Sequence, residues 1–228
     1  MGNEIEFKRQ IENVEITGKI DRIDVAESKD GKYIRVIDYK SSNKNIDLNE
    51  LSSGTQIQLL TYLDTAVSKE NCLPAGMLYF SLIDNVIKSD KNLTDEEIKQ
   101  ELTKQFRMNG IILADINIVK MMDTKIQKGS SNIIPAYIDK DGNLSSQRSN
   151  AITKEQFTKL QDVVKKIIKQ LGQEILEGNI EIKPTYNKKN KVEACKYCEY
   201  KSICGFNPSI HNYAFIDNKS KEEILDEL

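Results

Sequence analysis

Apolar and polar positions follow strand spacing in the first part of the chain. Residues 14–23 and 33–39 are rich in β-branched and apolar side chains, and the stretch between them at 28–32 has the composition of a turn. These features predict an antiparallel hairpin. Apolar residues then recur at helical spacing over 55–67, and 76–83 has the pattern of a buried strand. The order strand, helix, strand predicts an α/β fold with a right-handed crossover.

Two sequences with the form of a capping box open helices further along the chain, at residues 94–97 and 153–156. The first helix is expected to stop near Gly110, and Gly178 is a natural stop for the second. Both helices carry apolar stripes that we expect to face the core. The stripes consist of Ile98, Leu102 and Phe106 in the first helix and of Phe157, Leu160, Val164, Ile167, Leu171 and Ile175 in the second.

The length of the chain suits a single domain over residues 1–228 with one sizeable core. Residues 84–150 are expected to form an insertion within this domain, with a hairpin turn at 137–142. Residues 207–228 are expected to form a C-terminal tail. The amphipathic part of this tail contains Ile224, Leu225 and Leu228.

The composition is that of a soluble globular protein, since 39% of the residues are hydrophobic and 30% are charged. The formal net charge of −2 argues against nucleic-acid binding through bulk charge. Local charge differs, because six lysines stand against two glutamates between residues 183 and 201, although a solvated surface loop is the plainer interpretation. No apolar run approaches the roughly 20 residues that span a bilayer, and the start lacks a signal peptide, so we expect a cytoplasmic protein without membrane association.

Acidic and basic side chains meet on the predicted hairpin. Asp21 lies on its first strand, and Asp38 and Lys40 lie on the second. Because side chains alternate along a strand, Asp38 and Lys40 should project from one face while Tyr39 points away. Two carboxylates and a lysine in this arrangement can hold a hard divalent cation and neutralise a phosphate. The alternative is a solvated ion pair without catalytic use.

The motifs Gly-x-Ile-Asp, ending at Asp21, and hydrophobic-Asp-Tyr-Lys, ending at Lys40, resemble the core of RecB-like members of the PD-(D/E)xK nuclease superfamily. Gln58 and Tyr62 match the Gln-x-x-x-Tyr helix element that follows this core, and their spacing places them on one helix face. The resemblance implies a restriction-endonuclease-like core, a mixed central sheet flanked by helices. It also implies an Mg²⁺- or Mn²⁺-dependent deoxyribonuclease with exonuclease activity.

Carried over residue by residue, the resemblance implies that Asp21, Asp38 and the backbone carbonyl of Tyr39 are metal ligands. Lys40 would orient the attacking water or stabilise the charge of the transition state. Gln58 and Tyr62, named above, would support the site or touch DNA. For Asp24, a less secure candidate, a structural salt bridge to Arg22 or a nearby lysine is at least as well founded.

Cys195, Cys198 and Cys204 form a compact cluster, whereas Cys72 lies far away in the sequence. Clustered cysteines in a cytoplasmic protein are more often metal ligands than disulfides, and spacing alone favours zinc. The cluster is similar to that of the AddB family of helicase-nuclease subunits, in which one upstream cysteine and three downstream cysteines bind a [4Fe-4S] cluster. The resemblance makes residues 183–206 a cluster-binding segment with an upstream fourth ligand missing, and Cys72 a packing residue.

Many RecB-like nucleases also have a metal-binding histidine upstream of the core, but the only histidine here is His211, which we interpret as a surface residue. Both absences suggest an N-terminally truncated fragment. The AddB resemblance implies an AddA-type partner subunit, DNA as substrate, and processing of double-strand DNA ends for recombinational repair. The alternatives are a CRISPR-associated RecB-like exonuclease, a non-catalytic DNA-end clamp held by an iron-sulfur cluster, and a structural zinc module.

Overall fold

The computed structural model describes residues 2–83 and 92–227. The chain, predicted as one domain, divides into two compact units. The first consists of residues 1–9, 16–46 and 58–161, and the second of residues 10–15, 47–57 and 162–228. Among the described residues, no helix has the length and apolar character needed to cross a membrane.

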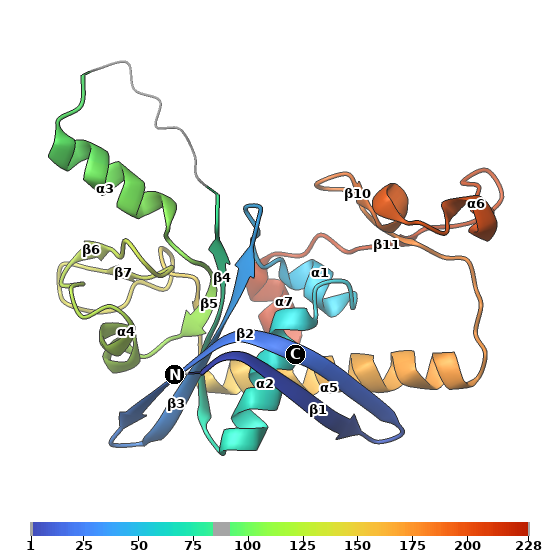
Figure 1. Cartoon of the computed structure of the whole chain (residues 1–228), viewed down its shortest axis with the longest axis horizontal. Helices are drawn as coiled ribbons and strands as arrows, with labels where there is room; N and C mark the ends of the chain where they lie inside the picture. Colours follow the sequence, from blue (N-terminus) through green and yellow to red (C-terminus); the bar gives the residue numbers. More distant parts are fainter. Residues whose placement is uncertain (1, 84–91, 228) are drawn as a thin grey trace. The chain divides into compact units, whose positions relative to one another are not determined.

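A six-stranded mixed sheet forms the centre of the first unit (Figure 1), which confirms the predicted fold class. Its strand order is β1-β2-β3-β4-β5-β8. Pairing is antiparallel between β2 and β3 and between β4 and β5, and parallel between β3 and β4 and between β5 and β8. The strands are β1 (Gly2–Ile11), β2 (Val14–Ser28), β3 (Gly31–Lys40), β4 (Leu73–Ser81), β5 (Asn109–Leu113) and β8 (Ala151–Ile152).

The predicted hairpin is formed by β2 and β3, with Arg22 opposite Ile37 and Ser28 opposite Gly31 at the turn. The predicted helix is α2 (Gln58–Glu70), which connects β3 to the parallel strand β4. The sequence pattern thus identified the hairpin and the crossover, with bounds that differ from the structure by a few residues.

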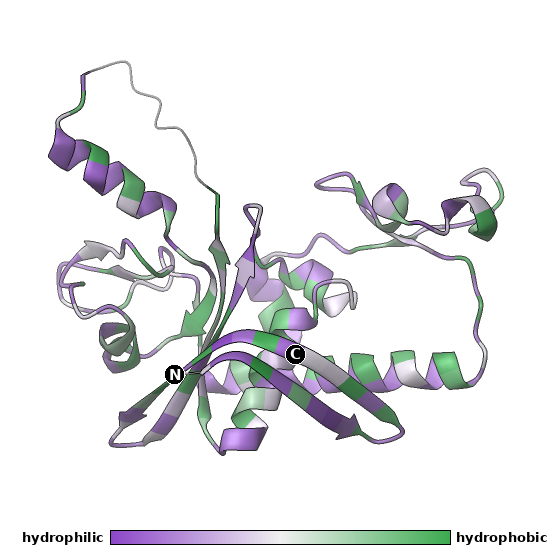
Figure 2. Cartoon of the chain, viewed as in Figure 1, coloured by the Kyte–Doolittle hydropathy of each residue, from purple (hydrophilic) through white to green (hydrophobic). Residues whose placement is uncertain are grey.

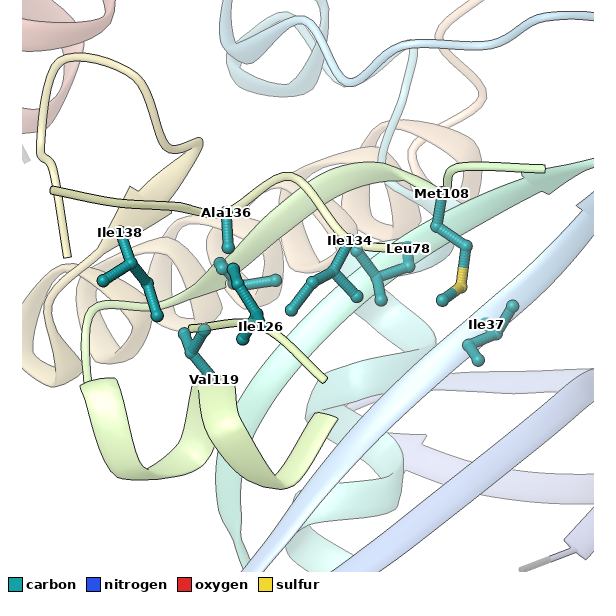
Figure 3. Close-up of a cluster of buried hydrophobic side chains, with 9 residues drawn as sticks. Ile37, Leu78, Met108, Val119, Ile126, Ile134, Ala136 and Ile138 are labelled. Carbon is teal, nitrogen blue, oxygen red and sulfur yellow. The ribbon is translucent and has the colours of Figure 1, made fainter. Parts of the chain in front are cut away.

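Helix α2 covers one face of this sheet, and a hydrophobic cluster covers the other (Figure 3). Ile37 of β3 and Leu78 of β4 meet α4 (Ile116–Met122) and the short strand β7 (Tyr137–Ile138) in this cluster. Strand β6 (Gly129–Ser130) pairs with β7. Since side chains alternate along β3, Asp38 points to the opposite face from Ile37, towards α2. Both faces are therefore packed, and Asp38 lies at the strand end of the α2 face, beyond the buried Ile34 and Val36.

The interval 84–150, predicted as an insertion, contains part of the central sheet. Strand β5 lies in this interval and pairs with β4, where Gly110 stands opposite Leu78. A Cβ atom at Gly110 would lie 2.2 Å from the carbonyl oxygen of Met77, so this glycine permits close strand approach and is not a helix stop. The first part of the interval, residues 84–91, lies outside the described residues. A hairpin-like turn is present after β7, where Ile138 forms a bridge with Leu144.

Helix α3 (Asp95–Gln105) begins with the predicted capping box, since Thr94 and Glu97 exchange hydrogen bonds. Its stripe does not face the core as predicted, because Ile98, Leu102 and Phe106 are all exposed. Helical periodicity identifies an amphipathic helix but does not show what covers its apolar face.

Helix α5 (Lys154–Leu176) also begins with the predicted capping box, between Thr153 and Gln156. It ends before Gly178, whose φ of +72° suits glycine, as predicted. Phe157, Leu160 and Val164 are buried, but the stripe emerges towards the C-terminal end, where Leu171 is 43% and Ile175 77% exposed. Figure 2 shows that hydrophobic bands continue to the last turn of α5.

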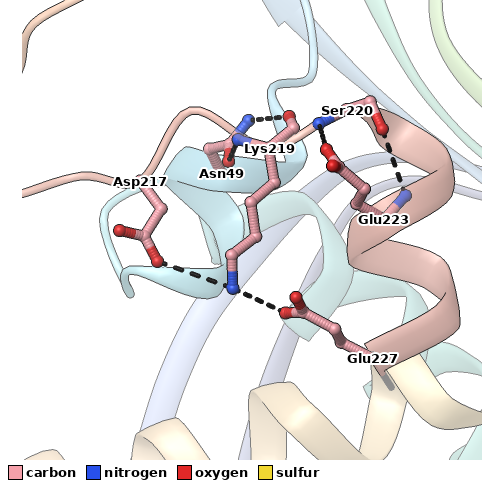
Figure 4. Close-up of polar contacts among 6 residues, drawn as sticks. All are labelled: Asn49, Asp217, Lys219, Ser220, Glu223 and Glu227. Atoms are coloured by element: carbon pink, nitrogen blue, oxygen red, sulfur yellow. Dashed lines mark hydrogen bonds and ion pairs between the residues drawn. The ribbon is translucent and has the colours of Figure 1, made fainter.

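Two short helices hold the second unit together, α1 (Leu48–Ser52) and α7 (Lys221–Glu227). Asn49 of α1 bonds to both the amide and the carbonyl of Lys219 (Figure 4). Ser220 and Glu223 form a capping box at the start of α7, and Lys219 bridges to Glu227 at 2.6 Å. Ile224 and Leu225 of the predicted tail are buried, and Leu228 lies outside the described residues.

The same unit contains a small sheet of order β10-β9-β11. Its strands and the adjoining short helices are β9 (Thr185–Asn187), β10 (Val192–Glu193), β11 (Ala214–Phe215), η1 (Ala194–Tyr197) and α6 (Lys201–Cys204). Asn187 and Asn190 both donate to the Glu50 carboxylate, which ties this sheet to α1. The lysine- and cysteine-rich segment is thus a small folded module.

Candidate active site

The two predicted carboxylates of the hairpin lie next to each other. Arg22 and Ile37 form the last regular pair of the β2–β3 ladder, so Asp21 and Asp38 come next and share a face. The Tyr39 amide donates to Asp21 Oδ2 at 2.8 Å. Asp38 is only 3% exposed. The hairpin register therefore brings a partly exposed carboxylate beside a buried one.

Lys40 connects these carboxylates to α2. Its Nζ lies 2.6 Å from Asp38 Oδ2 and donates to Gln58 Oε1 at 3.2 Å. Gln58 Nε2 in turn donates to the Tyr62 hydroxyl at 3.0 Å, and the Tyr62 ring meets Phe7 edge-on at 5.6 Å. One chain of contacts thus joins Asp38, Lys40, Gln58 and Tyr62, and it fixes the lysine.

Close packing explains why a glycine occupies position 18 in the first motif. A Cβ atom at this position would lie 2.8 Å from the Phe7 ring and 3.5 Å from the Tyr62 ring. The glycine therefore makes room for the two aromatic rings that hold α2 against the hairpin. The motif combines this packing requirement with the carboxylate three residues later.

The electrostatics of the site leave Asp38 incompletely compensated. Burial raises the pKa of Asp38 and the negative charge of Asp21 adds to this effect, while Lys40 and Lys44 oppose it. Ser81, which pairs with Lys40 across β3 and β4, has a buried hydroxyl with no hydrogen-bond partner among the described residues. Sequence analysis did not identify Lys44 or Ser81, because neither belongs to a motif.

Hard divalent cations fit this donor set. Mg²⁺ is commonly held by one or two carboxylates together with water, and Asp21 and Asp38 offer two adjacent carboxylates. Within residues 2–83 and 92–227, no group of three or more His, Cys, Asp and Glu side chains is arranged to hold a metal ion.

Asp24 has a structural role, which the sequence had left open. It accepts from Arg22 at 2.9 Å and forms an ion pair with Arg35 at 2.9 Å. Arg22 stands opposite Ile37, so this group occupies the face of the sheet away from Asp38. Asp24 is therefore not part of the site.

A buried ion pair close to the site was missed by sequence analysis. Arg9 Nη1 of β1 lies 2.6 Å from Asp64 Oδ2 of α2, and Gln161 of α5 donates to Asp64 Oδ1 at 3.0 Å. Asp64 follows Tyr62 by two residues, so this contact fixes α2 against β1. Its members are separated by 55 and 97 positions, and no local pattern connects them.

The cysteine triplet lies in the second unit, where Cys195 belongs to η1 and Cys204 ends α6. Burial raises the pKa of the Cys195 thiol, and the charges of Glu193, Cys198 and Cys204 add to this effect. The three cysteines do not form a set able to hold a metal in the part of the chain that the structure describes. A complete four-cysteine site is therefore not built from these residues.

Contacts with nearby residues explain the positions of Cys72 and His211. Cys72 is buried in the first unit and its thiol donates to the Glu70 carbonyl at 3.3 Å, as a packing residue would. His211 is partly buried, stacks on Phe206, and accepts from the Asn207 amide through Nδ1.

Comparison with known proteins places these observations among nucleases. A family model described as the PD-(D/E)XK nuclease superfamily matches residues 1–205. A protein of Clostridium kluyveri, named as a subunit of an ATP-dependent helicase/deoxyribonuclease, is 43% identical over 221 residues, and proteins with the same name from Thermoanaerobacter sp. and Clostridium acetobutylicum are each 44% identical. These matches cover 92–93% of this chain but only 19% of each relative, so the chain spans about a fifth of their length.

Proposed function

Because this chain belongs to the PD-(D/E)XK nuclease superfamily, we propose that it is the metal-dependent DNA nuclease domain of a helicase-nuclease. The observation that carries the proposal is the juxtaposition of Asp21, Asp38 and Lys40 at the end of the β2–β3 hairpin. A binding module has no need for a buried, incompletely compensated carboxylate, because such a group costs stability.

In this proposal Asp21, Asp38 and the carbonyl of Tyr39 hold Mg²⁺ or Mn²⁺. When bound, such a cation supplies Lewis-acid activation of water and of the phosphodiester. The fold shields Asp38 from bulk solvent and keeps both carboxylates on one face of the hairpin. The two carboxylates are thus already side by side before a cation binds.

Lys40 acts as the fixed cation of the site. Its ammonium contacts Asp38 and Gln58, which leaves donor capacity for a phosphate oxygen or the attacking water. Gln58 is held in turn by Tyr62, so the lysine is oriented before substrate binds. We infer that Lys40 stabilises the negative charge that develops on the phosphate, and that Gln58 and Tyr62 position it.

For the second unit, we propose that Cys195, Cys198 and Cys204 are three of the four ligands of a [4Fe-4S] cluster. Three thiolates do not complete such a cluster, so this chain alone should bind iron weakly. The neighbouring lysines are candidates for phosphate contact. Iron and sulfide content after anaerobic purification tests the proposal, with Cys72→Ser as a control that leaves the triplet intact; iron retained by a Cys198→Ser variant at wild-type level would contradict it.

The biological setting is proposed from the names of the relatives, each of which denotes one subunit of an ATP-dependent helicase/deoxyribonuclease. This setting implies a second, AddA-type subunit, DNA ends as substrate, and a role in recombinational repair in the cytoplasm. The same names favour this assignment over a CRISPR-associated exonuclease.

The direct test of the proposed function is digestion of linear DNA by the full chain with Mg²⁺ or Mn²⁺. We expect cleavage that requires the cation, is abolished by EDTA, and is lost in the Asp21→Asn variant. The Asp24→Asn variant is the matched control, since it removes a carboxylate three residues away on the other face. Cation-independent cleavage, or equal loss in both variants, would contradict the proposed site.

A further inference from the structure

Three aromatic side chains lie in a row across the end of the central sheet, on the face away from the two carboxylates. Tyr39 of β3 pairs with Phe80 of β4, and their rings meet edge-on at 5.7 Å. Phe80 then stacks against Phe106, which precedes β5, with ring centroids 6.0 Å apart. We call Tyr39, Phe80 and Phe106 the aromatic row.

The two end residues of the aromatic row are exposed to solvent. Phe80 is partly buried against the hydrophobic cluster of Figure 3 and anchors the row. Tyr39 is 38% and Phe106 43% exposed, so each end of the row presents ring surface to solvent. Large aromatic side chains usually bury most of their surface, which makes two exposed neighbours informative.

The position of the row relative to the proposed site is fixed by the backbone. Tyr39 stands between Asp38 and Lys40 in the sequence and projects from the opposite face of the same strand end. A DNA strand with a phosphate at the carboxylates can therefore pass over the ends of β3 and β4. Its next bases then reach the aromatic row.

Charge next to the row also suits a nucleic acid. Arg22 stands opposite Ile37, so its side chain shares a face with Tyr39. Asp24 pairs with both Arg22 and Arg35, so two guanidinium groups share one carboxylate on this face. A guanidinium beside exposed rings matches a ligand that combines flat bases with phosphates.

We propose that the aromatic row is a stacking platform for bases of a single DNA strand that leads into the carboxylate site. The inference rests on the proposed nuclease function and adds to it a surface that binds the bases of the substrate strand. Stacking on aromatic rings is tolerant of sequence, because every base has a π face. The row therefore favours unpaired DNA over duplex without selecting a sequence.

The test compares binding of an oligothymidylate with binding of an abasic oligomer of the same length, by fluorescence anisotropy of the full chain in Ca²⁺ at one salt concentration. We expect the wild type to bind the base-bearing strand roughly tenfold more tightly. The double variant Tyr39→Leu/Phe106→Leu should lose this preference, and Phe106→Leu alone should reduce it while binding the abasic strand as the wild type does. Leucine keeps the apolar cover of the core but removes the ring faces.

Tyr137→Leu is the matched control, because it removes a partly buried ring from the same unit, under the Arg148 guanidinium at 4.7 Å. It should keep the wild-type preference. A wild type that digests linear DNA with Mg²⁺ but binds both oligomers equally would overturn the stacking platform and leave the nuclease function intact. An unchanged preference in the double variant would also overturn the stacking platform alone. A wild type that neither binds nor cleaves DNA would overturn both proposals.

Discussion

Two nearly fully buried carboxylates of the same compact unit, Asp38 and Asp64, have opposite surroundings. Asp64 is 2% exposed, and its two oxygens are matched by Arg9 at 2.6 Å and Gln161 at 3.0 Å. Asp38 contacts one ammonium group, stands beside another carboxylate, and has a pKa raised by burial. A buried carboxylate whose oxygens are all paired, such as Asp64, stabilises the fold. A buried carboxylate with too few partners, such as Asp38, destabilises the fold unless a ligand binds to it.

The largest expected effect comes from neutralising the incompletely compensated carboxylate. Asp38→Asn should reduce Mg²⁺-dependent DNA cleavage at least about 1,000-fold, because it removes a charged ligand worth several kcal/mol in the transition state. The fold should survive, since the substitution also removes a buried charge of raised pKa. Cleavage kinetics and thermal unfolding of the same preparation measure both quantities, and a variant that cleaves like the wild type would remove Asp38 from the site.

Neutralising the compensated carboxylate should have the converse result. Asp64→Asn leaves Arg9 buried without its counter-ion and should lower the free energy of unfolding by about 3–5 kcal/mol. Cleavage well below the unfolding temperature should change little. Denaturant unfolding checks the first expectation, and a joint Arg9→Met/Asp64→Leu variant should recover part of the loss. Unchanged stability of Asp64→Asn would show that the two carboxylates are not distinguished in this way.

The smallest effects concern the two glutamines that serve these carboxylates. Gln58→Ala should lower the cleavage rate roughly tenfold with little loss of stability, because it frees Lys40 from its orientation. Gln161→Ala should cost about 1–3 kcal/mol of stability with little loss of cleavage, because it leaves a buried acceptor of Asp64 unsatisfied. If both variants lose the same quantity, the comparison between the two regions fails.

The sequence predicted the parts of this contrast that rest on local patterns. The hairpin follows from strand alternation around a turn, and α2 from the spacing of its apolar residues. The grouping of Asp21, Asp38 and Lys40 follows from the same alternation, because register and face are properties of neighbouring residues. The family motifs added Gln58 and Tyr62, whose helical spacing is also local.

Features that depend on long-range packing could not be predicted in this way. The contacts of Asp64 join three elements far apart in the sequence, and each partner by itself looks like an ordinary surface residue. Strand β5 was assigned to an insertion because its short apolar run carries no signal of the strand it pairs with. The stripes of α3 and of the last turns of α5 were expected in the core, since periodicity records amphipathicity but not burial.

The central claim is that Asp21 and Asp38 together form a divalent-cation site that Asp64 does not share. Titration of the full chain with Mn²⁺, followed by electron paramagnetic resonance of the free ion, measures it without requiring cleavage. We expect one bound Mn²⁺ in the wild type and in Asp64→Asn under conditions where this variant is folded, and loss of the bound ion in both Asp21→Asn and Asp38→Asn. Wild-type Mn²⁺ binding in Asp38→Asn, or its loss in folded Asp64→Asn, would contradict the account.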